Sequence, residues 1–211
     1  RLDIEEDVLR RFGKESTGTM RRGQVLVATQ VVEQSLDLDF DVLISDLAPI
    51  DLLLQRSGRL QRHSANNPRK HPDCLWITTP PEQGGVPQFD RSDKYVYDEY
   101  VLLRTWLTLK EQAQPYLHIP ESIPTLIEEV YGEHREDSYT GAIQKVLGDA
   151  WSEMTKGRIE AEDIAAERII HKPDFKRLLT QPNLSLGDED DPDLAPAFRA
   201  LTRLGDPGVQ V

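Results

Sequence analysis

Two short apolar runs with a polar stretch between them form the most informative part of the sequence. Residues 25–29 are VLVAT, a run rich in β-branched side chains, and residues 42–48 are VLISDLA. Such runs are typical of strands that are buried on both faces of a parallel sheet. We therefore expect residues 25–29 to form a central strand and residues 42–48 a second one. The acid-rich residues 30–41 suit a functional loop at the carboxyl end of a strand.

The segment PIDLLLQRSGRLQRH predicts a helix over about residues 50–63, because Pro and Asp suit its first turn. Gln55, Arg59 and Arg62 then share one helix face. Two guanidinium groups one turn apart can bind the oxygens of a phosphoryl group. Gly58 is unfavourable inside a helix and indicates a closely packed phosphate or backbone. A solvated basic face is the alternative, and this pattern alone leaves both interpretations open.

Three further elements complete the expected α/β part. An amphipathic helix should end at Gly13, acting as a left-handed cap, and residues 14–24 should form a surface loop. Residues 74–79, CLWITT, predict a third strand. Three strands and two helices are fewer than a complete doubly wound domain contains. The pattern therefore predicts a partial parallel sheet, in a chain that begins inside its domain.

The remainder has helical periodicity and is expected to form a mainly helical accessory domain. Ser92 should cap one long helix, and Pro124 and Gly132 should bound another. The helices expected in this part cover residues 92–113, 118–132, 143–154, 160–170 and 174–181. The predicted domains are residues 1–91, a connecting helix over residues 92–113, and an accessory domain over residues 114–211. The acid run DEDDPD is expected to be a solvated loop, and no metal site is expected.

The net charge of −12 argues at first against a nucleic-acid binder, because phosphates are neutralised by Lys and Arg. Residues 1–63, however, have a net charge of −2, so the acidic excess lies in the rest of the chain. We do not expect that acidic remainder to be the main path for nucleic acid. A single cysteine, Cys74, excludes an internal disulfide, and no apolar run approaches the roughly 18 residues of a membrane span. These features predict a cytoplasmic protein without membrane contact.

The pair ATQVVEQSLDLD and QRSGRLQR resembles motifs V and VI of superfamily 2 helicases. The longer sequence around this pair, VLVATQVVEQSLDLDFD followed by PIDLLLQRSGRLQRH, resembles the CRISPR-associated helicase–nucleases of type I interference systems. The stretches VYDEYVLLRTW, IPESIPTLIEEVYG and TRLG are similar to the same family, although the specific resemblance lies within residues 25–63. The resemblance implies a RecA-like fold for the partial sheet, as the second of two helicase lobes.

The resemblance also implies roles for single residues. Arg62 matches the arginine finger and Arg59 its companion, both directed at the γ-phosphate of ATP in the transition state. Gln55 would sense the nucleotide, and Arg56 would hold motif V to motif VI. Asp37 matches the acid that approaches the nucleotide ribose or the arginine fingers.

Two residues before the acidic loop are implied in nucleic-acid binding. Thr29 matches the hydroxyl that contacts the nucleic-acid backbone, and Gln30 lies beside it. A hydroxyl that caps a turn is the alternative for Thr29, and both interpretations stay open.

The resemblance further implies ATP and Mg²⁺, single-stranded DNA, and an RNA-guided surveillance complex as ligands and partners. The sequence contains no G-x-x-x-x-G-K-[ST] loop and none of the His-Asp metal motif of the family's nuclease domain. ATP and Mg²⁺ should therefore be bound mainly by an upstream RecA-like domain, and the nuclease metal by an upstream nuclease domain. The chain alone is expected neither to hydrolyse ATP nor to cut DNA.

Two other functions remain open at this point. One is a different superfamily 2 helicase, acting in repair or RNA metabolism, that shares motifs V and VI. The other is a non-catalytic interaction module with a degenerate RecA-like lobe that binds a protein partner through its acidic helices.

Overall fold

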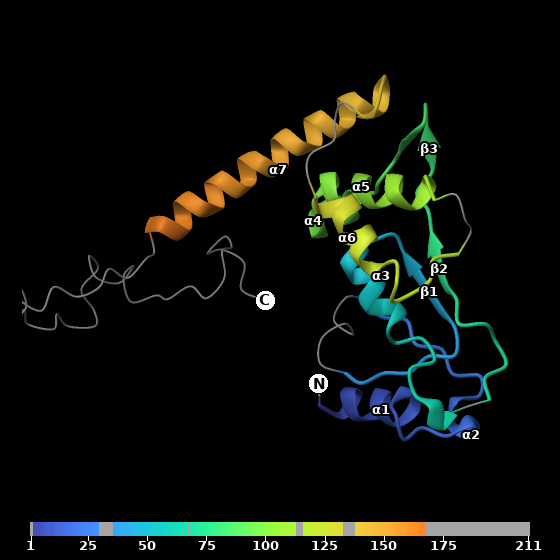
Figure 1. Cartoon of the computed structure of the whole chain (residues 1–211). Helices are drawn as coiled ribbons and strands as arrows, with labels where there is room; N and C mark the ends of the chain where they lie inside the picture. Colours follow the sequence, from blue (N-terminus) through green and yellow to red (C-terminus); the bar gives the residue numbers. More distant parts are fainter. Residues whose placement is uncertain (1, 30–35, 67, 113–115, 133–137, 168–211) are drawn as a thin grey trace, which may run out of the picture. The chain divides into compact units, whose positions relative to one another are not determined.

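A computed structural model describes residues 2–29, 36–66, 68–112, 116–132 and 138–167 (Figure 1). The chain divides into two compact units, residues 1–151 and residues 152–211. The domain boundaries expected from the sequence stay a prediction.

A short parallel sheet lies in the first unit, as the sequence predicts. Strand β1 (Leu43–Asp46) pairs with strand β2 (Leu75–Thr78), with Leu43 opposite Leu75 and Asp46 opposite Thr78. The two strands lie side by side in Figure 1, with helices beside them. The expected α/β class with a partial parallel sheet and a predominance of helices is confirmed.

The prediction of a central strand over residues 25–29 is wrong. This segment has no strand ladder, and Val25 and Val27 are 84% and 92% exposed. A central strand needs a hydrogen-bonded neighbour on each side, and β1 is paired only with β2 among the described residues. Apolar composition alone therefore did not produce a strand here.

The first helix follows the expected pattern, but its end differs in detail. Helix α1 (Leu2–Phe12) is followed by Gly13, whose φ is not positive, so the predicted left-handed cap is wrong. A Cβ at Gly13 would lie 2.3 Å from the Leu9 carbonyl oxygen, and glycine is required by this close approach. The expected surface loop contains the short helix α2 (Gly18–Arg21), whose Arg21 is buried.

Helix α3 (Ile50–Ser57) is shorter than predicted and ends at Gly58, its C-cap. The chain then leaves the helical path because its backbone pairs with Phe40: Phe40 N–H donates to Arg59 O at 2.9 Å, and Gln61 N–H donates to Phe40 O at 2.8 Å. Gln61 takes a positive φ of 46°. The expectation that Gln55, Arg59 and Arg62 share one helix face is therefore wrong. No backbone approaches Gly58 closely among the described residues, since a Cβ there would meet α3 carbonyls at ordinary contact distances, and the expected phosphate stays a prediction.

The segment predicted as one helix over residues 92–113 forms two. After a hairpin of β3 (Glu82–Gln83) and β4 (Val86–Pro87) come α4 (Arg91–Val96) and α5 (Glu99–Lys110). Asp90, and not Ser92, is the N-cap of α4, and its N–H donates to the Asp93 carboxylate at 3.2 Å. An extended backbone at Tyr97 separates the two helices.

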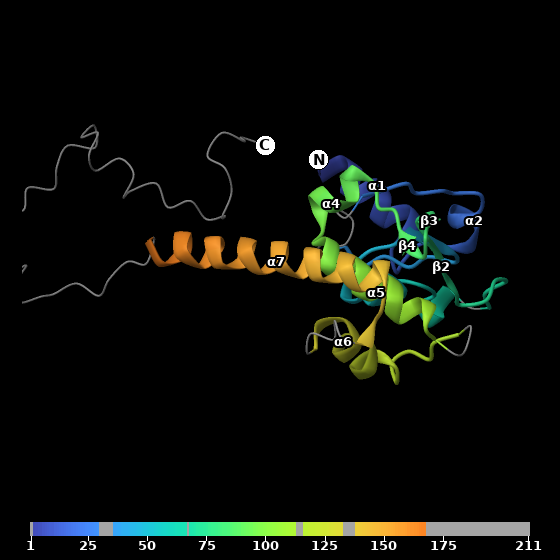
Figure 2. The ribbon, with the colours of Figure 1, turned by 90° about the horizontal axis from the view of Figure 1, so that it is seen from above.

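Helix α5 is buried on most of its surface, as its two apolar stripes predict. It packs against α6 (Ile123–Tyr131), as Figure 2 shows, and α6 also packs against α3 (Figure 1). The Thr105 hydroxyl accepts a 3.2 Å hydrogen bond from the Ile50 N–H, which ties α5 to the first turn of α3. A large part of the core of the first unit thus lies between these three helices and holds α3 in place.

Helix α7 (Ala142–Glu167) is continuous through Gly157, so the predicted stop there is wrong. Ion pairs one turn apart, Lys156 with Glu160 and Arg158 with Glu162, accompany the helix past the glycine. In the described part of the chain, no helix is both long enough and apolar enough to cross a membrane. The helix predicted over residues 174–181 and the acid run lie outside the described residues.

Candidate functional site

Arg62 and Asp37 form an ion pair beyond the end of α3. Arg62 Nη1 lies 3.4 Å from Asp37 Oδ1, and His63 Nε2 lies 3.0 Å from the same oxygen. The side chains of Arg62 and Asp37 are about half exposed, 49% and 50%. Water screens such a pair, so Arg62 can exchange Asp37 for another anion at little energetic cost. The structure thus brings two of the predicted site residues together.

A buried charge cluster lies behind this pair, and the sequence analysis missed it. Asp39 is completely buried. Its Oδ1 accepts a hydrogen bond from the Arg62 backbone N–H at 2.9 Å. Its Oδ2 accepts from Asn66 Nδ2 at 2.7 Å and from Arg69 Nη2 at 2.5 Å, and Arg21 Nη1 lies 3.6 Å away. Charges this deeply buried are stable only when they are paired and hydrogen-bonded, as these are.

The buried charge cluster consists of Arg21, Asp39 and Arg69, and Asp41, whose side chain is 43% exposed, pairs with its two arginines. Arg69 Nη1 donates to the Asp41 carboxylate, and Arg21 Nε lies 3.6 Å from Asp41 Oδ2. Arg21 also donates to the Ser16 hydroxyl at 2.5 Å and to the Asp39 carbonyl. The cluster therefore joins α2, the segment before β1 and the loop after the 3₁₀ turn Ser64–Asn66.

The pKa shifts of Asp39 and Arg69 both favour the charged forms of these two groups. Burial alone would raise the pKa of Asp39, but hydrogen bonds from Asn66 and Arg69 and the charges of Arg69 and Arg21 outweigh it. The pKa of Asp39 is consequently held below its usual value. Burial opposes the charge of Arg69 as well, yet its hydrogen bonds to Asp41 and Asp39 raise the Arg69 pKa.

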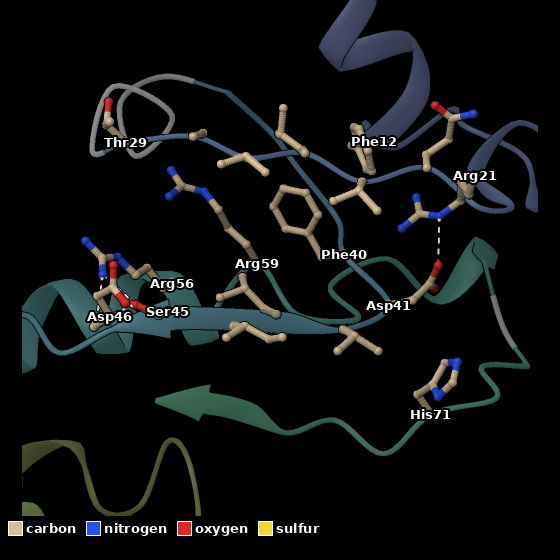
Figure 3. A pocket seen from close by; sticks show the side chains of 18 of the residues that line it. Phe12, Arg21, Thr29, Phe40, Asp41, Ser45, Asp46, Arg56, Arg59 and His71 are labelled. Atoms are coloured by element: carbon tan, nitrogen blue, oxygen red, sulfur yellow. Dashed lines mark hydrogen bonds and ion pairs between the residues drawn. The ribbon is translucent and has the colours of Figure 1, made fainter. Parts of the chain in front are cut away.

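A cavity of about 1050 Å³ lies between residues 22–29 and β1. Thr29, Arg56 and Arg59 are among its lining residues, and Figure 3 shows the Arg59 side chain extending toward the segment that carries Thr29. Phe40 also lines it, with its ring 5.4 Å from that of Phe12. The cavity thus combines an exposed hydroxyl, guanidinium groups and an apolar wall.

Arg56 points from α3 toward the carboxyl end of β1. Its Nη1 donates to Ser45 Oγ at 2.5 Å and to Asp46 O at 3.3 Å, and its Nη2 donates to Tyr97 OH at 3.3 Å. These contacts tie α3 to β1 and to the segment between α4 and α5. Its predicted role between motifs V and VI stays a prediction, because residues 30–35 are not described.

The site residues predicted from the sequence therefore lie mainly in two places, at the ion pair of Arg62 with Asp37 and in the cavity. Gln55 is exposed on α3, and neither it nor Asp37 nor Arg62 is among the described residues that line the cavity. Gln30 lies outside the described residues. Within the described ranges, no three His, Cys, Asp or Glu side chains lie close enough together to hold a metal ion.

Known proteins similar to this chain share one description. Residues 1–65 match the family described as CRISPR-associated nuclease/helicase Cas3, C-terminal. The CRISPR-associated endonuclease/helicase Cas3 of Thermus thermophilus is 39% identical over 213 residues, which cover 97% of this chain and 22% of that protein. The chain thus spans about a fifth of the length of this curated relative.

Solved structures agree with the sequence relatives. The T. fusca Cas3 structure with ADP is 40% identical, with a TM-score of 0.66, over 81% of this chain and 19% of that one. A chain of a CRISPR RNA-guided surveillance complex in a pre-nicking state is 38% identical, with a TM-score of 0.66, over 82% of this chain and 20% of that one. The motif pair, the partial parallel sheet and these similarities lead to one assignment: the chain belongs to the Cas3 family of CRISPR-associated nuclease/helicases and corresponds to its C-terminal part.

Proposed function

We propose that this chain is part of an ATP-dependent translocase and helicase–nuclease that moves along single-stranded DNA. In type I CRISPR interference the complete protein would unwind and degrade foreign DNA in the cytoplasm. The chain supplies the arginine fingers and a DNA-contact segment. The chain by itself is inactive in this proposal, because it contains neither a phosphate-binding loop nor the nuclease motif.

The ion pair between Arg62 and Asp37 is the observation that carries the proposal. It places Arg62, the last arginine of QRSGRLQR, against Asp37, the first acid of SLDLD. The pair is half exposed, so Arg62 can exchange Asp37 for another anion at little energetic cost. Arg62 leaves Asp37 for the γ-phosphate when the other RecA-like lobe presents a nucleotide. There it stabilises the negative charge that develops during hydrolysis, an effect worth about 10³ to 10⁵ in rate. Arg59 acts as its companion, Gln55 senses the nucleotide, and Asp37 approaches the ribose or receives Arg62 again after product release.

The exposed segment before residue 30 supports the DNA contact. Its residues 25–29 have no strand ladder with any described residue, and in this proposal their backbone N–H groups and the Thr29 hydroxyl bind phosphate oxygens. Gln30 extends the same contact. A backbone-directed contact of this kind suits an enzyme that moves along DNA without reading its sequence, and it needs little positive charge.

ATP is the substrate of the proposed motor, and Mg²⁺ neutralises its phosphates when bound. Arg62 and Arg59 are suited to bind the phosphate oxygens of such a nucleotide. The described residues contain no acidic group arranged for a metal, so we assign Mg²⁺ and most nucleotide contacts to the upstream RecA-like domain. The proposed partners are single-stranded DNA and an RNA-guided surveillance complex, the assembly in which a relative has been solved.

A non-catalytic interaction module is the second candidate. It is favoured by Ile44 and Trp76, which face each other across β1 and β2 and are 70% and 62% exposed. An uncovered apolar pair on a sheet face suits contact with another protein surface.

The decisive experiment is ATP turnover by the complete protein, stimulated by single-stranded DNA, with and without Arg62→Ala. We expect kcat to fall by roughly a thousandfold or more. Arg91→Ala is the matched control, because Arg91 is an exposed arginine at the start of α4, and it should leave turnover within about twofold. Equal turnover of the wild type and Arg62→Ala would refute the arginine finger and favour the interaction module.

A further inference from the structure

Arg62 is held at two points by two acids that stand two residues apart in the sequence. Asp37 pairs with the guanidinium at 3.4 Å, and Asp39 accepts a hydrogen bond from the Arg62 backbone N–H at 2.9 Å. The two contacts differ in environment, because Asp37 is half exposed and Asp39 is completely buried. Another anion can therefore replace Asp37 as the partner of the Arg62 guanidinium, whereas the hydrogen bond between Asp39 and the Arg62 N–H is shielded from solvent.

The Asp39 carboxylate is itself fixed from the opposite side. Its Oδ2 accepts hydrogen bonds from Asn66 and Arg69, and Arg21 lies within ion-pair distance. The Asp39 N–H also donates to the Phe12 carbonyl at 2.8 Å, which anchors this residue to the end of α1. Asp39 is therefore a rigid support for whatever it binds on Oδ1.

The segment that Asp39 supports has no regular structure of its own. It leaves α3 at Gly58, is bonded to the Phe40 backbone on either side of Leu60, and passes through the positive φ of Gln61. Arg62 comes directly after that residue. Its N–H bond to Asp39 sets the direction in which the Arg62 side chain leaves the backbone.

We propose that Asp39, anchored by Arg69, Asn66 and Arg21, is the positioning residue that orients Arg62 for phosphate binding. This inference rests on the proposed function, since it assigns Asp39 a role in the same reaction. Asp39 touches no substrate and acts only through the Arg62 backbone. A displacement of about 1 Å in a group that acts on the transition state can cost a hundredfold in rate, so a support of this kind has a measurable effect.

Asp39→Asn is the informative substitution, because both carboxylate oxygens are occupied. An amide offers only one oxygen, and the charged Arg69 and the Asn66 amide compete for it on the Oδ2 side. The amide nitrogen of the new asparagine then faces the Arg62 N–H, and two donors cannot bond to each other. The substitution thus removes the hydrogen bond to the Arg62 N–H and changes the size of the side chain very little. In the complete protein we expect kcat for DNA-stimulated ATP turnover to fall by roughly ten- to a hundredfold, with KM for ATP within about threefold.

Asp41→Asn is the matched control. It removes one negative charge that pairs with the same two arginines, Arg69 and Arg21, at a side chain that is 43% exposed and does not contact the Arg62 N–H. Gln61 Nε2 contacts Asp41 through the backbone carbonyl, which the substitution keeps. We expect kcat within about threefold of the wild type. A loss as large as that of Asp39→Asn would mean that cluster charge, and not the Arg62 bond, matters, and would overturn the proposal.

A double-mutant cycle separates positioning from general stability. If Asp39 acts through Arg62, then Asp39→Asn should lower kcat by less than about twofold in an Arg62→Ala background. A full additional loss in that background would overturn the proposal, as would a folded Asp39→Asn protein with wild-type kcat. If Asp39→Asn fails to fold, Asn66→Ala takes its place in the cycle, since it removes one anchor and keeps the charge balance. The proposed function fails separately, through unchanged turnover of Arg62→Ala alone.

Discussion

Gly13 offers a sharp test of the packing beside the site, because a methyl group there has no space. A Cβ at this position would lie 2.3 Å from the Leu9 carbonyl oxygen, which is a backbone atom and cannot rotate away. The same oxygen accepts the Gly13 N–H at 2.7 Å, so moving the two apart also weakens that hydrogen bond. Gly13 in addition forms a β-bridge with Leu38, the residue before Asp39.

The expected cost of Gly13→Ala follows from these contacts. Relief of the overlap should cost about 1–3 kcal/mol, as for other forced insertions of a methyl group, and the weakened hydrogen bond about 1 kcal/mol. The local free energy of opening should therefore fall by about 2–4 kcal/mol. Since about 1.4 kcal/mol is a factor of ten, amides of residues 2–16 should exchange roughly 30- to 700-fold faster.

Hydrogen exchange with mass spectrometry on the complete protein measures this directly. Gly18→Ala is the control, because a Cβ at Gly18 meets nothing within 4 Å and its φ is not positive. That variant should exchange like the wild type or more slowly, since alanine favours helix. Exchange of Gly13→Ala within about twofold of the wild type would refute the described close approach of Gly13 to the Leu9 carbonyl.

Two further predictions concern stability. Because the folded pKa of Asp39 lies below its usual value, its stabilising effect is present above about pH 4 and is lost as pH falls through the lower folded pKa. The melting temperature of the wild type should accordingly drop more steeply than that of Asp39→Asn below pH 4, and parallel curves would contradict the pKa assignment. Leu103→Ala, at a fully buried position of α5, should lower the free energy of unfolding by about 2–5 kcal/mol in denaturant titration. Ile44→Ala, at an exposed position, should cost less than about 0.5 kcal/mol, and equal effects would contradict the described core.

Local sequence signals determined a large part of the fold. The apolar runs at β1 and β2, the all-round apolar pattern of α5, and the Pro and Gly that bound α6 are short-range features that describe burial or backbone geometry directly. The motif pair likewise identified the family, because its residue types and spacing are specific. These predictions hold because each depends on neighbours within one or two turns of chain.

Tertiary structure decided the remainder. Residues 25–29 have the composition of a strand, but a strand also requires partners, and these are not present for it among the described residues. The helix after β1 could not be delimited from its sequence, because it ends where the backbone beyond Gly58 pairs with Phe40. Pairing of this kind joins residues about 20 positions apart, and no periodicity within either segment encodes it.

The candidate site shows the same division. Arg62 and Asp37 were identified from their motifs, and the structure brings them into contact. Asp39 alternates with apolar residues in the sequence, which suggests a shared face with Asp37 but gives no sign that it is buried. Its burial is possible only because two arginines neutralise its charge, Arg21 from 18 residues before it and Arg69 from 30 residues after it in the sequence. The sequence by itself thus determined which residues we propose to carry the chemistry, and only the tertiary structure decided what holds them in position.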